Sequence, residues 1–167
     1  MRIFLTGHGY NNSNNIWRDL FMLGFLIAIL SGALMSIQGV FNTEVTKNSS
    51  MWSANAFVQL TAFAVCILAW LFTDRTSFMK VFSVQPKYML LGGVIGAFIT
   101  YTVIVSINQL GPAKSAMFIV IAQLIVSYAI ELMGIWGMEK QPFSLRKAAG
   151  MLIAVAGIAI FKWETQQ

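Results

Sequence analysis

The chain has 167 residues, of which 57% are hydrophobic and only 10% are charged. Soluble domains carry about 25% charged residues, and a core of this size cannot bury so many apolar side chains. The composition therefore argues against a soluble protein and favours a membrane protein. The net charge is +5, but the basic residues stand between apolar runs, as membrane topology requires, and form no patch for nucleic acid.

The chain begins with a polar, asparagine-rich tail over residues 1–19, whose apolar piece is too short for a signal-peptide core. Five apolar runs follow, each near the length of about 20 residues that crosses a bilayer as a helix. We place these spans at about 20–41, 52–73, 88–110, 115–137 and 148–163. Backbone groups inside lipid must be satisfied within their own segment, which requires helices. The sequence thus predicts an all-α membrane protein, a bundle of five transmembrane helices over residues 20–164.

Lysine and arginine are distributed unequally between the two ends of these spans. Eight lie in the N-terminal tail and in the second and fourth loops, and three lie on the opposite side. Short loops rich in lysine and arginine stay in the cytoplasm. We therefore expect the N-terminus in the cytoplasm and, with five spans, the C-terminus outside.

Amide side chains gather in the expected outer half of the spans. They are Gln38, Asn42, Asn55, Gln59, Asn108 and Gln109. Amides of this kind often join neighbouring helices, with about 0.6 kcal/mol per hydrogen bond. The functional alternative is a polar vestibule that opens to the outer side and binds a substrate. Tyr101 and Tyr128 could add ring faces for a cation, because an aromatic face attracts positive charge.

The fourth span carries Gln123, Ser127 and Glu131, spaced four residues apart and therefore on one helix face. A carboxylate within a span costs about 2.5–3.5 kcal/mol on insertion scales and usually faces a cavity or a partner. The structural interpretation pairs Glu131 with Arg146 or Lys147 at the cytoplasmic edge. The functional interpretation makes it a site for a proton or a cation, with Gln123 bound to substrate near the midplane.

The sequence offers little for enzyme chemistry. Cys66 is the only cysteine and His8 the only histidine, so neither an intrachain disulfide nor a cluster of His and Cys metal ligands can form. No phosphate-binding loop or nucleophile set is visible. We expect no enzyme activity, no metal and no cofactor.

Small residues mark places where helices could approach closely. Gly92-x-x-x-Gly96 and Gly150-x-x-x-Ala154 follow the spacing that lets two membrane helices meet. Gly111-Pro112 predicts a tight turn that makes the third and fourth spans antiparallel neighbours.

Four segments together resemble the short YdcZ-type branch of the drug/metabolite transporter superfamily, over about residues 24–162. They read SGALMSIQGVFN, GGVIGAFITYTVIVSINQLGPAKSAMFIVIAQL, ELMGIWG and KAAGMLIAVAG. The family's first-span pattern falls on Gly32, Gln38 and Asn42. Its Gly-Gln-Leu pattern falls on Ala122, Gln123 and Leu124, so alanine replaces the glycine, and Glu131 stands where the family usually has aspartate. The resemblance implies an inner-membrane exporter of five spans, whose larger relatives join two five-span halves in inverted topology.

These observations lead to an expected function, a secondary transporter that exports a small organic cation or metabolite in exchange for protons. Five spans are an odd number, and transporter sites often lie between inverted repeats, so we expect half of a dimer. The other half would be an oppositely inserted five-span chain or a second copy. Two alternatives remain, a non-transporting membrane subunit that scaffolds a partner and a flippase for a lipid or lipid carrier. The expected location is the cell (inner) membrane, where the chain contacts lipid and a small-molecule substrate but no nucleic acid.

Overall fold

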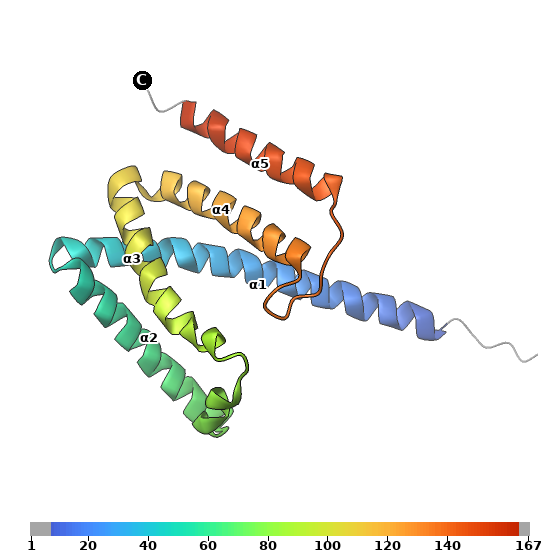
Figure 1. Ribbon diagram of the computed structural model, residues 1–167, viewed down its shortest axis with the longest axis horizontal. Coiled ribbons are helices and arrows are strands. Elements are labelled where there is room, and N and C mark those ends of the chain that lie inside the picture. The colour runs from blue at the N-terminus through green and yellow to red at the C-terminus, as the bar shows by residue number, and fades with distance from the viewer. Residues whose placement is uncertain (1–7, 164–167) are drawn as a thin grey trace, which may run out of the picture. The chain divides into compact units, whose positions relative to one another are not determined.

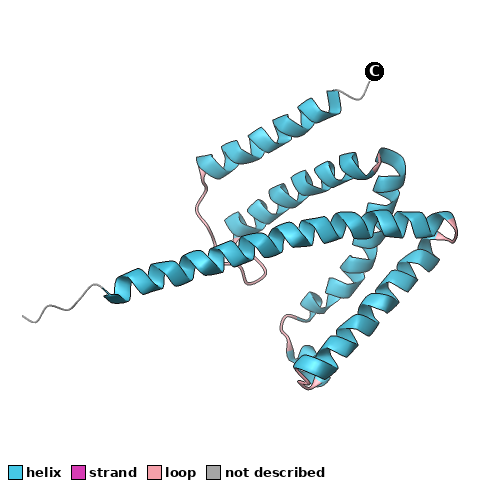
Figure 2. Ribbon diagram, turned by 180° about the vertical axis from the view of Figure 1, so that it is seen from behind, coloured by secondary structure: helices cyan, strands magenta, loops and turns pink. Residues whose placement is uncertain are grey.

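The computed structural model describes residues 8–163, and all regular elements in this range are helices (Figures 1 and 2). The all-helical class predicted from the sequence is confirmed for the described residues. The elements in chain order are α1 (His8–Lys47), α2 (Met51–Thr73), the 3₁₀ helices η1 (Phe78–Ser83) and η2 (Lys87–Leu91), α3 (Gly92–Leu110), α4 (Pro112–Met133) and α5 (Leu145–Trp163).

Within residues 8–163, four stretches of helix are long and apolar enough to cross a membrane. They are Arg18–Lys47, Met51–Thr73, Lys87–Leu110 and Pro112–Met133. α5 has 19 residues and carries three basic residues near its ends, Arg146, Lys147 and Lys162. Large apolar side chains stay exposed along these helices, for example Phe63 at 60% and Phe98 at 59%. Such extensive apolar surface is suited to a lipid environment rather than to water.

The chain divides into two compact units, with the boundary between Gln38 and Gly39 inside α1. The first unit consists, in its described part, of α1 from His8 to Gln38. α1 has 40 residues, which corresponds to about 60 Å of helix, twice the hydrocarbon thickness of about 30 Å. The helix therefore extends into the residues 8–19 expected as a polar tail.

In the second unit each helix packs on the next one in the chain, α2 on α3, α3 on α4 and α4 on α5. The last part of α1 also lies close to α3. A Cβ added to Gly39 would come within 2.7 Å of Ile107 Cδ1 and 3.3 Å of Val103 Cγ1, so a larger residue here would require these side chains to shift. Ile104 of α3 is completely buried. α3 thus supplies the centre of this unit.

The turn between α3 and α4 consists of one residue, Gly111, with φ 80° and ψ 163°. Its N–H donates to the Ile107 carbonyl at 2.9 Å, and its carbonyl accepts from Ser115 N–H at 3.1 Å. Pro112 begins α4, where a missing N–H costs nothing. The Ser106 hydroxyl donates to that of Ser115 at 3.0 Å and links the two helices beside the turn. The predicted tight turn at Gly111-Pro112 is confirmed.

The end of α4 sets the path of the chain toward α5. Gly134 adopts φ 64° and ψ 41°, and its N–H donates to the Ile130 carbonyl at 2.9 Å. This left-handed cap ends the helix at Met133, short of the expected limit at residue 137. The loop then returns, and Gln141 N–H donates to the Glu131 carbonyl at 2.9 Å. The loop thereby brings the first turn of α5 beside the last turn of α4.

Candidate functional site

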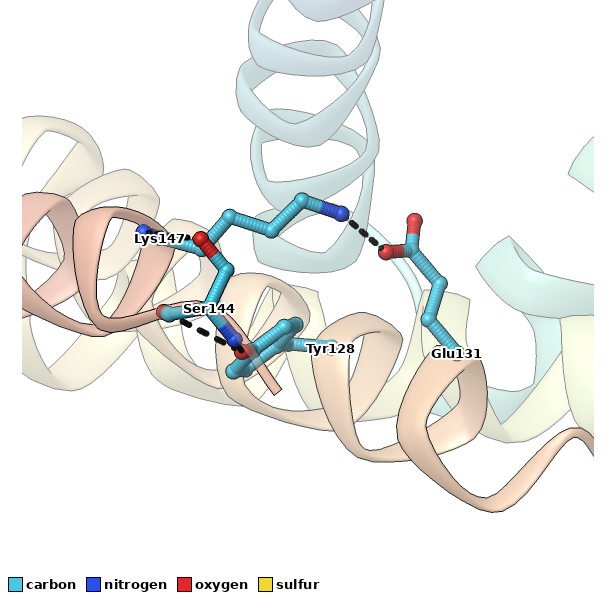
Figure 3. A network of polar contacts seen from close by, with 4 residues as sticks. All are labelled: Tyr128, Glu131, Ser144 and Lys147. Carbon is cyan, nitrogen blue, oxygen red and sulfur yellow. Dashed lines mark hydrogen bonds and ion pairs between the residues drawn. The ribbon is translucent and has the colours of Figure 1, made fainter. Parts of the chain in front are cut away.

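Glu131 on α4 forms an ion pair with Lys147 in the first turn of α5 (Figure 3). The Lys147 ammonium donates to Glu131 Oε2 at 2.7 Å, and the two side chains are 51% and 44% exposed, respectively. Of the two basic residues considered from the sequence, the structure brings Lys147 to the carboxylate. The pair is half open to the surroundings and is not enclosed in a dry core.

Tyr128 lies one helical turn before Glu131 and fixes the start of α5 (Figure 3). Its hydroxyl accepts from Ser144 N–H at 2.9 Å and donates to the Ser144 carbonyl at 3.3 Å. The residue is only 9% exposed. Lys147 Nζ lies 5.7 Å from the centroid of the ring, within the range of a cation–π contact. The ring that could have held a substrate cation therefore contacts a lysine of the same chain.

The ion pair changes the acid–base behaviour of the lysine, which precedes the expected fifth span. The hydrogen bond that Lys147 donates to Glu131 raises the pKa of its ammonium, against a smaller opposing contribution from desolvation. Because this pKa is raised on folding, the stabilisation by the pair is fully present below the lysine's usual pKa. It is lost only as the pH rises through the raised value. The raised pKa therefore keeps the Lys147 ammonium charged at neutral pH.

Gln123 and Ser127 stand on the exposed surface of α4. Glu131 is the only member of this predicted stripe with a side-chain hydrogen bond to another described residue. The polar groups of Gln123 and Ser127 are accordingly available to a ligand, to water or to a partner chain.

A second group of polar and aromatic side chains joins α2 to α3. This α2–α3 seam consists of Trp52, Asn55 and Gln59 from α2 with Thr100 and Tyr101 from α3. Asn55 Nδ2 donates to the Ala97 carbonyl at 2.9 Å, and Gln59 Nε2 donates to Thr100 Oγ1 at 3.4 Å. The rings of Trp52 and Tyr101 are stacked, with centroids 4.9 Å apart and planes inclined by 22°.

The six amides expected at one depth differ in their surroundings. α3 brings Asn55 and Gln59 into the seam, whereas Asn108 and Gln109 are exposed at the end of α3. Asn42 is buried, with 7% of its surface exposed. Gln38 belongs to the first unit and is exposed.

Two residues of these groups, Trp52 and Ser144, were given no role in the sequence analysis. The spacing of these residues in the sequence could have indicated their contacts. Trp52, Asn55 and Gln59 recur at intervals of three and four residues, which places them on one helix face. Ser144 stands three residues before Lys147, whose N–H approaches its hydroxyl at 3.4 Å, the arrangement of a helix N-cap.

Comparison with known families matches this chain to a family of membrane transport proteins. The family model described as "Putative inner membrane exporter, YdcZ" covers residues 23–160. Together with the apolar helices, this match defines a multi-pass inner-membrane transport protein. The chain belongs to the YdcZ family, as the resemblance of its four segments indicated. No curated protein and no solved structure matches the chain.

Proposed function

We propose that the chain is a secondary exporter of a small organic cation or metabolite, coupled to protons through Glu131. The observation that carries the proposal is an acid on an apolar helix whose only side-chain partner among the described residues is Lys147, at a half-exposed position. An ion pair in such a position is of modest stability. The lysine can therefore be replaced at the carboxylate by a proton or by a substrate cation.

Exchange follows from this competition. When Glu131 is ionised it binds Lys147 or a substrate cation, and when it takes up a proton its attraction for either cation is lost. Proton and substrate thus occupy the same acid in turn, which is the requirement for antiport. Gln123, eight residues earlier on the same face and about 12 Å away along the helix, has free polar groups for a substrate approaching the midplane. The experiment that tests this proposal compares coupled export by the wild-type chain and by Glu131→Gln.

A second candidate function is a non-transporting membrane subunit that scaffolds a partner. It is favoured by the closed network of Tyr128, Glu131, Ser144 and Lys147, which joins α4 to α5 without a ligand. On this account Glu131 is a structural residue, and any variant that breaks the pair has the same consequence. A lipid or lipid-carrier flippase is a third alternative, for which the exposed polar side chains of α4 would receive a headgroup.

The proposed topology has five spans, with a cytoplasmic N-terminus and an external C-terminus, on the basis of the 8:3 distribution of basic residues. It is tested by single cysteines at Ser49, between α1 and α2, and at Phe78, in η1. Both are introduced after replacement of Cys66 by serine. An impermeant thiol reagent added to intact cells should label position 49 and leave position 78 unmodified. Labelling of position 78 together with protection of position 49 would show that the chain has the opposite orientation.

The proposed assembly is a dimer with a five-span chain inserted in the opposite direction. A Cβ added at Gly92, Gly96 or Gly150 would meet no atom within 4 Å, so these small-residue faces are free to contact another helix. The unequal distribution of lysine and arginine favours a related partner chain over an inverted copy. Crosslinking in native membranes should yield a product of about twice the monomer mass. Recovery of monomer alone contradicts the dimer.

A further inference from the structure

Asn55 on α2 has an oriented and nearly inaccessible carboxamide. Only 2% of its surface is exposed, and its Nδ2 donates to the Ala97 carbonyl on α3 at 2.9 Å. The opposite orientation would place two acceptor oxygens against each other, so this hydrogen bond also fixes Oδ1. That oxygen is buried and has no hydrogen-bond partner among the described residues. Buried acceptors in proteins nearly always have a donor, which here must come from elsewhere.

Two donors of the seam, the Gln59 amide and the Thr100 hydroxyl, donate to other acceptors. Gln59 Nε2 donates to Thr100 Oγ1, and the single proton of the Thr100 hydroxyl is directed to the Gly96 carbonyl at 3.1 Å. Burial of an acceptor without a donor is unfavourable. A ligand that supplies an N–H or O–H group therefore gains affinity at Asn55 Oδ1.

An aromatic pair stands next to this acceptor. Trp52 precedes Asn55 by three residues, so the two side chains are neighbours on one face of α2. Tyr101 stacks on Trp52 from α3, and Trp52 is 60% exposed. Tryptophan has the ring face that attracts cations most strongly. The seam thus combines a buried acceptor with an accessible aromatic surface that favours positive charge.

We infer that the α2–α3 seam binds an organic cation that carries at least one N–H group. The N–H donates to Asn55 Oδ1, while the charge and the apolar body of the ligand lie against Trp52 and Tyr101. This inference rests on the proposed function, for which it defines the substrate class as protonated primary, secondary or tertiary amines and excludes quaternary ammonium ions. Access to Oδ1 requires α2 and α3 side chains to separate, and the Gln59–Thr100 contact at 3.4 Å is the longest hydrogen bond of the seam.

A graded series of three probes tests this inference. They are 2-phenylethylammonium, its N,N-dimethyl derivative and its N,N,N-trimethyl derivative, which share one ring and one positive charge but differ in N–H groups. Binding to the full chain in lipid nanodiscs is measured by titration calorimetry. The first two should bind, and the trimethyl ion should bind about tenfold or more weakly, because it cannot form a hydrogen bond to the buried acceptor.

The variants assign the difference to one atom. Asn55→Ala should abolish the discrimination between the dimethyl and trimethyl probes. Asn108→Ala makes the same chemical change at an exposed position of α3 and should preserve the discrimination. Trp52→Leu should weaken all three probes alike, since the ring attracts the charge whatever its substituents.

The inference is overturned if no probe binds, if the trimethyl ion binds the wild-type chain as tightly as the others, or if the discrimination survives in Asn55→Ala. If Asn55→Ala does not fold, the wild-type series alone decides. Failure here differs from failure of the proposed function. If the three probes bind equally and Glu131→Gln loses coupled export, the ligand site at the seam is rejected and the exporter function is retained. If the seam discriminates between the probes and Glu131→Gln exports normally, the ligand site at the seam is retained and the coupling role of Glu131 is rejected.

Discussion

Replacing Glu131 by glutamine is expected to abolish proton-coupled export and to leave the amount of protein in the membrane unchanged. Glutamine keeps the shape of the side chain but can neither hold a cation by charge nor take up a proton. Coupled efflux of radiolabelled organic cations from cells measures the effect, with immunoblotting of membrane fractions for abundance. Normal export by this variant, or its absence from the membrane, would show that Glu131 has a structural role only.

Lys147→Gln is the matched control for this experiment. Both substitutions remove the ion pair between Lys147 and Glu131, but only Glu131→Gln removes the acid. The transporter account expects coupled export to persist in Lys147→Gln. The scaffold account expects the two variants to fail equally, because each removes the same link between α4 and α5.

Replacing Gly134 by alanine is expected to destabilise the connection between α4 and α5 strongly. At φ 64° any L-residue with a side chain is strained, at a cost of about 1–2 kcal/mol. The added Cβ would also lie 2.7 Å from Lys140 Cβ and 3.0 Å from Lys140 Cα. The second of these atoms belongs to the backbone, so the loop itself must move. Since this loop positions Lys147 beside Glu131, the ion pair should weaken as well.

Gly137→Ala separates the collision from the backbone strain. Gly137 also has a positive φ, of 83°, but an added Cβ there meets no atom within 4 Å. Thermal unfolding in detergent should give a lower midpoint for Gly134→Ala than for Gly137→Ala. A further loss of about 1 kcal/mol corresponds to about 2–4 °C for a chain of this size. Equal midpoints would mean that the loop absorbs the collision without cost.

The helical class and the positions of the long apolar helices could be predicted because a segment that lies in lipid must be both apolar and helical. The ends of helices were harder to predict. α4 stops at Met133 because Gly134 adopts a left-handed conformation, and a glycine in the sequence does not reveal which φ it takes. α1 already includes His8, which hydropathy does not predict, because a helix that leaves the bilayer no longer needs apolar residues.

Side-chain partners depend on how helices rotate against one another, which hydropathy does not specify. Glu131 was noticeable in the sequence because a carboxylate is costly in an apolar helix. The sequence limited its partner to Arg146 or Lys147. The path of the loop through Gly134 determines which of these two side chains reaches the carboxylate. In the sequence, Asn55 is equivalent to the other amides of the spans. Only its contact with Ala97 in the structure distinguishes it.

The most direct test of the central claim is proton movement in proteoliposomes that contain the purified chain, together with any partner chain that copurifies, and a pH-sensitive dye. Organic cations from a defined panel are added under an imposed pH gradient, and Glu131→Gln vesicles correct for passive amine leakage. The account predicts that at least one cation drives proton flux in wild-type vesicles and that this flux is absent in Glu131→Gln vesicles. Identical traces for the two proteins across the panel would contradict it.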